Sequence, residues 1–142
     1  MVENIKKIIL VIHGPNLNLI GIQSSKNKTQ ITLDKINYAL RIKARKLNIK
    51  LKIIQTHDEA KAVTFLHRNR NKCIGVLIAP MSWHAGGFVI SDSLHFLELP
   101  YRSVSIENHV HSLFYLKNNV YNKNPISAYV SALELLNKDL KL

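Results

Sequence analysis

A run of five apolar residues, followed at once by a turn, most constrains what this chain can fold into. Residues 8–12 (Ile-Ile-Leu-Val-Ile) are typical of a strand that is buried on both faces of a parallel sheet. His13-Gly14-Pro15-Asn16 then ends the strand, because glycine can adopt a positive φ, proline lacks an N–H donor and asparagine suits turns. In an open α/β sheet this loop lies at the carboxyl edge, where ligands bind. We therefore expect a ligand site beside this turn.

Strand-like and helix-like segments alternate along the rest of the chain. Further strands are predicted at residues 49–55, 74–79 and 101–106. Helices are predicted at residues 33–47 with Thr32 as N-cap, after the cap Asp58, at 86–97, and from Pro125 to about 139 with Asn124 as N-cap. Residues 23–31 are predicted to form an exposed loop and 108–124 to be irregular. The alternation predicts one α/β domain over residues 1–142, a doubly wound parallel sheet of flavodoxin-like order 2-1-3-4, with or without a fifth strand.

Composition restricts the class of protein further. A chain of 142 residues suits one domain, and no apolar run approaches the roughly 20 residues that a membrane span needs. No secretory signal is visible at the start, so we expect a cytoplasmic protein. The single cysteine, Cys73, excludes an internal disulfide and is predicted to be a buried, unreactive thiol.

The formal net charge of +11 lies entirely in the first half of the chain. Residues 1–72 carry 15 Lys and Arg against 4 Asp and Glu, whereas residues 73–142 carry 5 of each kind. Such a basic half could attract anionic metabolites, although lysines that simply coat helix surfaces would give the same charge. No basic–aromatic pattern of nucleic-acid-binding proteins occurs, so nucleic acid is not favoured as a partner.

Motifs for nucleotide binding and for nucleophilic catalysis are missing, but histidines recur at strand ends. The chain has no P-loop, dinucleotide fingerprint or nucleophile elbow. His13, His57 and His84 each follow a different predicted strand, as does His109 or His111. Imidazoles gathered at one edge could bind zinc or form an acid–base pair. The alternative, which each histidine favours when taken alone, is a hydrogen-bonding turn residue.

The opening turn also resembles the signature of the type II 3-dehydroquinate dehydratases, which reads N-G-P-N-L-N-L-L-G. Further segments keep one ungapped register with that family from residue 8 to residue 108: Thr32-Leu33-Asp34, Gln55-Thr56-His57-Asp58-Glu59, Leu77-Ile78-Ala79-Pro80, Ile90-Ser91-Asp92-Ser93-Leu94 and residues 100–108. The resemblance implies a flavodoxin-like fold and the dehydration of 3-dehydroquinate to 3-dehydroshikimate in the shikimate pathway. It also implies that no cofactor is needed and that the chain self-associates as trimers or dodecamers.

By the same resemblance, the family's proton-transfer groups are mostly replaced in this chain. The family uses a tyrosine base made acidic by an arginine, an asparagine that holds a water at the enolate oxygen, and a histidine acid with a glutamate partner. Asn16 retains the asparagine, whereas Gln23 occupies the arginine position and Lys28 the tyrosine position. Ser105 stands at the histidine position and Ser103 at that of its glutamate partner.

The positions that the resemblance assigns to substrate binding are altered as well. Ala79 replaces a substrate-binding asparagine, and Ala85 replaces a substrate-binding histidine. Ile106 and Glu107 occupy the family's substrate-binding segment after the fourth strand. Asp92 retains an aspartate that resembles one reaching the site of a neighbouring subunit.

These replacements lead to two hypotheses about activity. A lysine ammonium at Lys28 stays protonated near neutral pH, and a serine at Ser105 has no useful pKa for protonating a leaving group. The first hypothesis is a dehydratase whose activity is lost or strongly altered. The second is a non-catalytic relative that binds a small anionic metabolite or a metal, or that joins an assembly.

Overall fold

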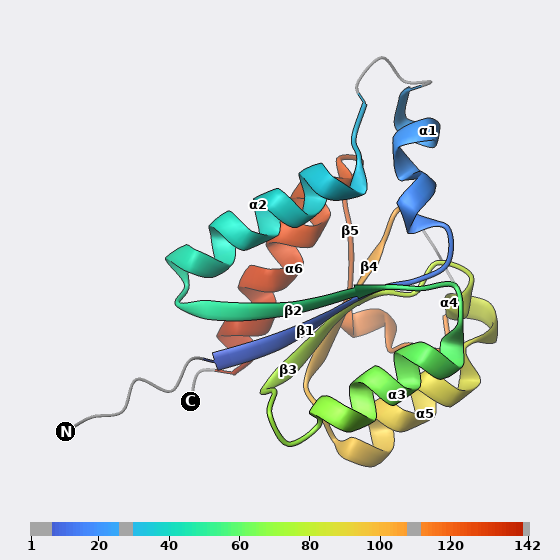
Figure 1. Ribbon diagram of the computed structural model, residues 1–142, viewed down its shortest axis with the longest axis vertical. Coiled ribbons are helices and arrows are strands. Elements are labelled where there is room, and N and C mark those ends of the chain that lie inside the picture. The colour runs from blue at the N-terminus through green and yellow to red at the C-terminus, as the bar shows by residue number, and fades with distance from the viewer. Residues whose placement is uncertain (1–6, 26–29, 108–111, 141–142) are drawn as a thin grey trace.

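The computed structural model describes residues 7–25, 30–107 and 112–140 as a five-stranded parallel sheet between two helical layers (Figure 1). The strand order is β2-β1-β3-β4-β5, which confirms the predicted flavodoxin-like order and adds the fifth strand. The strands are β1 (Lys7–His13), β2 (Ile49–Gln55), β3 (Gly75–Ala79), β4 (Tyr101–Ser105) and β5 (Asn119–Tyr121). Within the described residues, no helix is both long and apolar enough to span a membrane.

The helices cover the two faces of the sheet in pairs. Helices α2 (Leu33–Lys46) and α6 (Pro125–Asp139) cover one face, and α3 (Glu59–Asn69) and α5 (Phe88–Leu97) cover the other (Figure 1). Two short helices, α1 (Ile20–Ser25) and α4 (Trp83–Gly86), lie at the carboxyl edge. This arrangement leaves the carboxyl ends of the strands beside the loops that carry the predicted site.

Local signals in the sequence begin three of these helices. The Thr32 hydroxyl accepts a hydrogen bond from the Lys35 backbone N–H at 3.2 Å, and the Asp58 carboxylate accepts one from Ala60 at 2.9 Å. Asn124 caps α6 in the same way, with proline at the first helical position. Each cap satisfies an N–H group that the first turn of a helix would otherwise leave without a partner. The predicted starts of α2, α3 and α6 are therefore confirmed.

Strand β1 is the centre of the hydrophobic core. Ile9 and Val11 pack toward α2 and α6, while Leu10 and Ile12 pack toward α3 and α5, and all four are fully buried. A strand that is covered by helices on both faces has no solvent-exposed side, which explains its continuous apolar sequence. Cys73 is buried as predicted, and this burial raises the pKa of its thiol.

The predicted helix at residues 86–97 is wrong at its start. The chain forms α4 first, bends at Gly87 and begins α5 one residue later. Gly87 has a non-helical ψ of 58°, and a Cβ placed there would approach the Cβ of Trp83 to 2.5 Å. Only glycine fits at this bend, because any other residue would place its Cβ against Trp83.

Two segments predicted to lack regular structure contain some. The expected loop at 23–31 is helical in α1 as far as Ser25. The expected irregular segment 108–124 contains a 3-10 helix (Leu116–Asn118) and β5, which pairs with β4. Neither element has enough apolar periodicity to be predicted, because each depends on contacts with the rest of the fold.

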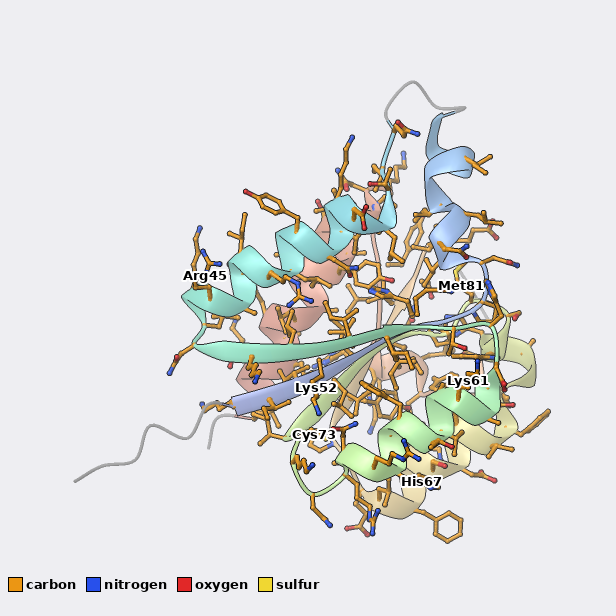
Figure 2. All side chains as sticks on the ribbon, viewed as in Figure 1. Arg45, Lys52, Lys61, His67, Cys73 and Met81 are labelled. Atoms are coloured by element: carbon orange, nitrogen blue, oxygen red, sulfur yellow. The ribbon has the colours of Figure 1, made fainter. Side chains whose placement is uncertain are left out.

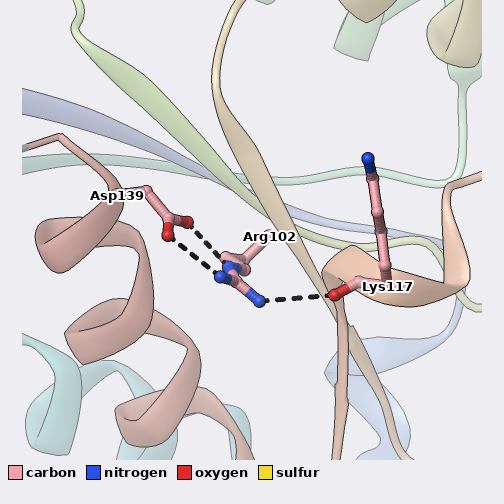
Figure 3. A network of polar contacts seen from close by, with 3 residues as sticks. All are labelled: Arg102, Lys117 and Asp139. Atoms are coloured by element: carbon pink, nitrogen blue, oxygen red, sulfur yellow. Dashed lines mark hydrogen bonds and ion pairs between the residues drawn. The ribbon is translucent and has the colours of Figure 1, made fainter.

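An ion pair joins β4 to the C-terminal helix (Figure 3). Arg102 donates from Nε to Asp139 Oδ2 at 2.8 Å and from Nη2 to Asp139 Oδ1 at 3.0 Å, and its Nη1 reaches the Lys117 carbonyl at 3.5 Å. This bidentate geometry raises the pKa of Arg102 above its usual value. The contact ties β4, α6 and the segment that leads into β5 together.

Candidate functional site at the carboxyl edge

The turn after β1 is held against the end of β3 by its backbone. The Gly14 N–H donates to the Ala79 carbonyl at 2.9 Å, and the Gln55 side chain donates to the Gly14 carbonyl at 3.2 Å. None of the described glycines has a positive φ; within this turn the left-handed residue is Asn16, at 68°. Gly14 is therefore required for close approach of two backbones, and not for the positive φ that the sequence suggested.

Replacing Gly14 by alanine should test this role. A Cβ at Gly14 would lie 2.5 Å from the Pro80 carbonyl oxygen and 2.8 Å from that of Ala79, which are backbone atoms that cannot rotate away. We expect Gly14→Ala to lower the free energy of unfolding by about 3 kcal/mol, measured by urea denaturation. The matched control is Gly86→Ala, because a Cβ there meets nothing within 4 Å. Equal stability of the two variants would contradict the close-approach interpretation.

Asn16 and His57 meet at the edge, one from the β1 turn and one from the loop after β2. The Asn16 backbone N–H donates to His57 Nδ1 at 3.1 Å, so the neutral imidazole carries its proton on Nε2. Both side chains are exposed. The retained asparagine thus presents its amide to solvent from a turn that a neighbouring imidazole holds in place.

His13 faces the core, away from the edge. Its Nδ1 accepts a hydrogen bond from the Tyr129 hydroxyl at 2.9 Å, and its Nε2 donates to Asn37 Oδ1 at 2.8 Å. The ring is fully buried, and this burial lowers its pKa to about 4, so His13 is neutral near pH 7. His13 follows Ile9 and Val11 at a spacing of two, and therefore points to the same α2–α6 face.

A buried polar network connects α4, β4 and β5; we call it the His84 network. His84 Nε2 lies 3.3 Å from the Ser105 hydroxyl, and its Nδ1 lies 2.6 Å from the Ser112 hydroxyl. Ser105 and Ser103 each donate to Asn119 Oδ1 at 2.9 Å. Because the Ser105 proton goes to Asn119, His84 donates to Ser105 from Nε2. The network therefore holds the His84 imidazole against the hydroxyl of Ser105.

Sequence reasoning named His84, Ser105 and Ser103 separately, but it missed Ser112 and Asn119 and the contacts that join them all. Asn119 was hidden in the segment predicted to be irregular, although it is the first residue of β5. His84 immediately precedes Ala85, the position that the resemblance assigns to a substrate-binding histidine. The sequence therefore contained one signal, a histidine one residue before the position where the resemblance expects one. Only the tertiary structure shows that this histidine contacts Ser105.

The remaining predicted site residues lie on several different elements of the fold. Ala79 ends β3 and is fully buried, whereas Ala85 is exposed on α4. The others are Gln23 on α1, Ile106 and Glu107 directly after β4, and the exposed Asp92 on α5. Lys28, His109 and His111 lie outside the described residues. In the part of the chain that the structure describes, no three His, Cys, Asp or Glu side chains group closely enough to hold a metal ion.

Comparison with protein families gives a match over nearly the whole chain. The model of the family described as dehydroquinase class II matches residues 7–132. A 3-dehydroquinate dehydratase from Caldanaerobacter subterraneus subspecies tengcongensis is 32% identical over 102 residues, covering 72% of this chain and 69% of that protein. One from Buchnera aphidicola of Acyrthosiphon pisum is 34% identical over 100 residues, covering 70% and 67%.

Comparison with solved structures gives the same fold. The type II dehydroquinase from Propionibacterium acnes superimposes with a TM-score of 0.81 at 25% identity, covering 96% of this chain and 100% of that one. The sheet order and the carboxyl-edge loops described above therefore belong to a known architecture.

Proposed function

Because this chain belongs to the class II dehydroquinase family, we propose that it binds a small carboxylated ring metabolite of the 3-dehydroquinate type without dehydrating it efficiently. The family's reaction removes a proton beside a ketone and expels a hydroxyl group, so it needs both a base and an acid. We place the proposed binding site at the carboxyl edge of the sheet. The residues at that edge support binding more strongly than proton transfer.

Ser105 is the observation that carries this proposal. The resemblance assigns its position to the histidine that protonates the leaving hydroxyl group. Ser105 is 1% exposed, and its proton is directed at Asn119. A serine hydroxyl does not titrate near neutral pH, so it cannot act as an efficient general acid. The neighbouring His84 is hydrogen-bonded between Ser105 and Ser112.

Groups that could bind a ligand are kept at the same edge. Asn16 presents an exposed amide in its left-handed turn, and His57 stands beside it. Ile106 and Glu107 continue the chain directly after β4, at the family's substrate-binding positions. The net charge of +11 favours an anionic ligand over a neutral one. We propose the cytoplasm as the place where this ligand is met.

The outer face of α5 supports self-association. Phe88, Asp92 and Phe96 follow one another at intervals of four residues and share one side of the helix. Phe88 is 61% exposed and Phe96 is 88% exposed, which is unusual for side chains of this size. We propose that this face joins copies of the chain into the trimers or dodecamers that the family resemblance implies.

A titration can test ligand binding without turnover. Adding 3-dehydroquinate to the ¹⁵N-labelled protein should shift the backbone signals of Asn16, His57 and Glu107, because these residues line the edge. Asn16→Ala should weaken binding about tenfold, since it removes an exposed hydrogen-bonding amide. The control is Asn71→Ala, which changes an exposed asparagine in the turn after α3. Absence of shifts at the edge, or equal weakening in both variants, would overturn the proposal.

A further inference from the structure

A second concave region lies at the opposite end of strand β2 from the carboxyl edge. A hollow of about 340 Å³ opens between the last turns of α2 and the beginning of β2. Its polar lining consists of Arg41, Arg45, Lys50 and the amide of Asn48. Figure 2 shows Arg45 at the end of α2, beside the turn that leads into β2. The hollow therefore combines the positive charges of two arginines with a hydrogen-bonding side chain.

These cations are unpaired, in contrast to their neighbours. Lys43 on the same helix pairs with Glu134 at 2.8 Å, and Lys52 on β2 donates to Asn69 Oδ1 at 2.8 Å. Among the described residues, Arg41 and Arg45 form no ion pair and their side chains no hydrogen bond. Arg41 and Arg45 are four residues apart on one helix, a spacing at which like charges repel each other. A bound anion would remove that repulsion.

The local backbone keeps the hollow open on its polar side. Asn48 has a left-handed φ of 58°, which turns the chain sharply from α2 into β2. Lys50 also borders the hollow, but it alternates along β2 with Ile49 and Leu51, whose side chains face α2, so its side chain points to the other face of the strand. The end of α2 contributes a partial negative charge of about half an elementary charge. The two guanidinium charges of Arg41 and Arg45 outweigh it.

We propose that this hollow binds a phosphoryl group. Guanidinium groups hold phosphate oxygens through paired N–H donors, and two arginines one helical turn apart beside the Asn48 turn match such a group in charge and in the kind of donor. The phosphoryl group can belong to a small phosphorylated metabolite or to a nucleic-acid backbone, since both present the same oxygens. The seven-residue strand β2 puts about 20 Å between this hollow and the carboxyl edge, so the site is independent of the function proposed above.

Pyrophosphate is the probe for this site, measured by isothermal titration calorimetry at low ionic strength. The unmodified protein should bind it, and the double variant Arg41→Gln/Arg45→Gln should bind it about tenfold more weakly or worse, because two charge-assisted contacts are lost. The control, Lys72→Gln/Lys123→Gln, removes the same charge from exposed positions outside the hollow. All four side chains are exposed, so both variants should fold.

Each outcome of this calorimetric comparison either supports or overturns the proposed site. Tenfold weakening in the arginine variant, with the control within twofold of the unmodified protein, supports the site. No binding of pyrophosphate, or equal weakening in both variants, overturns it, because net charge alone would then explain any attraction. A labelled single-stranded oligonucleotide, followed by fluorescence anisotropy, identifies the source of the phosphoryl group. If the affinity for the oligonucleotide falls in the arginine variant but not in the control, the ligand is a nucleic-acid backbone. If only the affinity for pyrophosphate falls in the arginine variant, the ligand is a small phosphorylated metabolite.

Discussion

Turnover of 3-dehydroquinate by this protein is expected to be at least about four orders of magnitude slower than by a relative that keeps the tyrosine base and the histidine acid. A positioned general acid or base contributes roughly 10²–10⁴-fold each, and the family resemblance implies that this chain replaces both. Ser105, which the resemblance assigns to the acid position, is buried and bonded to Asn119. Formation of the conjugated enone product, followed by ultraviolet absorbance at equal enzyme concentrations, measures the difference.

A variant at the base position makes this prediction sharper. The family resemblance assigns Lys28 to the position of the tyrosine, and a lysine ammonium is ordinarily protonated near neutral pH. Lys28→Ala should therefore leave any residual turnover within about threefold of the unmodified protein. Turnover close to that of the relative, or residual turnover that depends on Lys28, would show that the protein dehydrates 3-dehydroquinate without the tyrosine base and the histidine acid. Either result would contradict the proposed function.

Acidification is expected to destabilise the fold through His13 by about 3 kcal/mol. Burial lowers the pKa of His13 from 6.5 to about 4, so the unfolded chain gains a proton at a pH where the folded chain does not. Stability from this residue is complete above pH 6.5, falls as the pH approaches 4 and levels off below it. The magnitude follows from the size of the shift, at about 1.4 kcal/mol for each pH unit.

The His13 effect can be separated from those of other acidic groups by comparing variants. His13→Asn removes the titrating ring and should flatten the loss of unfolding free energy between neutral pH and pH 4. Urea denaturation over a series of pH values compares this variant with the unmodified protein. The assignment fails if the His13 variant loses as much stability on acidification as the unmodified protein.

The elements predicted best are those whose signals are local. Strand β2 was predicted at its observed bounds, Ile49–Gln55, because its first residues alternate between buried and exposed. Helix α6 was predicted from the Asn124 cap and the following proline to its end near Asp139. These patterns act within a few residues, so they do not depend on the rest of the fold.

The elements predicted least well depend on contacts between distant residues. The break before α5 lies at Gly87, where the approach of Trp83 leaves no room for a Cβ. Strand β5 exists because Asn119 and its neighbours pair with β4. The sequence of a short segment with weak periodicity does not indicate which distant residues it will contact.

The sequence by itself determined the strand order, the family and the turn after β1, because these follow from apolar patterning and from a motif continuous in the chain. Only the tertiary structure decided what the residues of that turn do. His13 is directed into the core by the two-residue period of β1, where it meets Tyr129, 116 positions away. His84 likewise contacts a residue far along the chain, Ser105, which is 21 positions away. Contacts at such separations arise only when strands and helices pack, and this packing decides which side chains at the carboxyl edge can take part in chemistry.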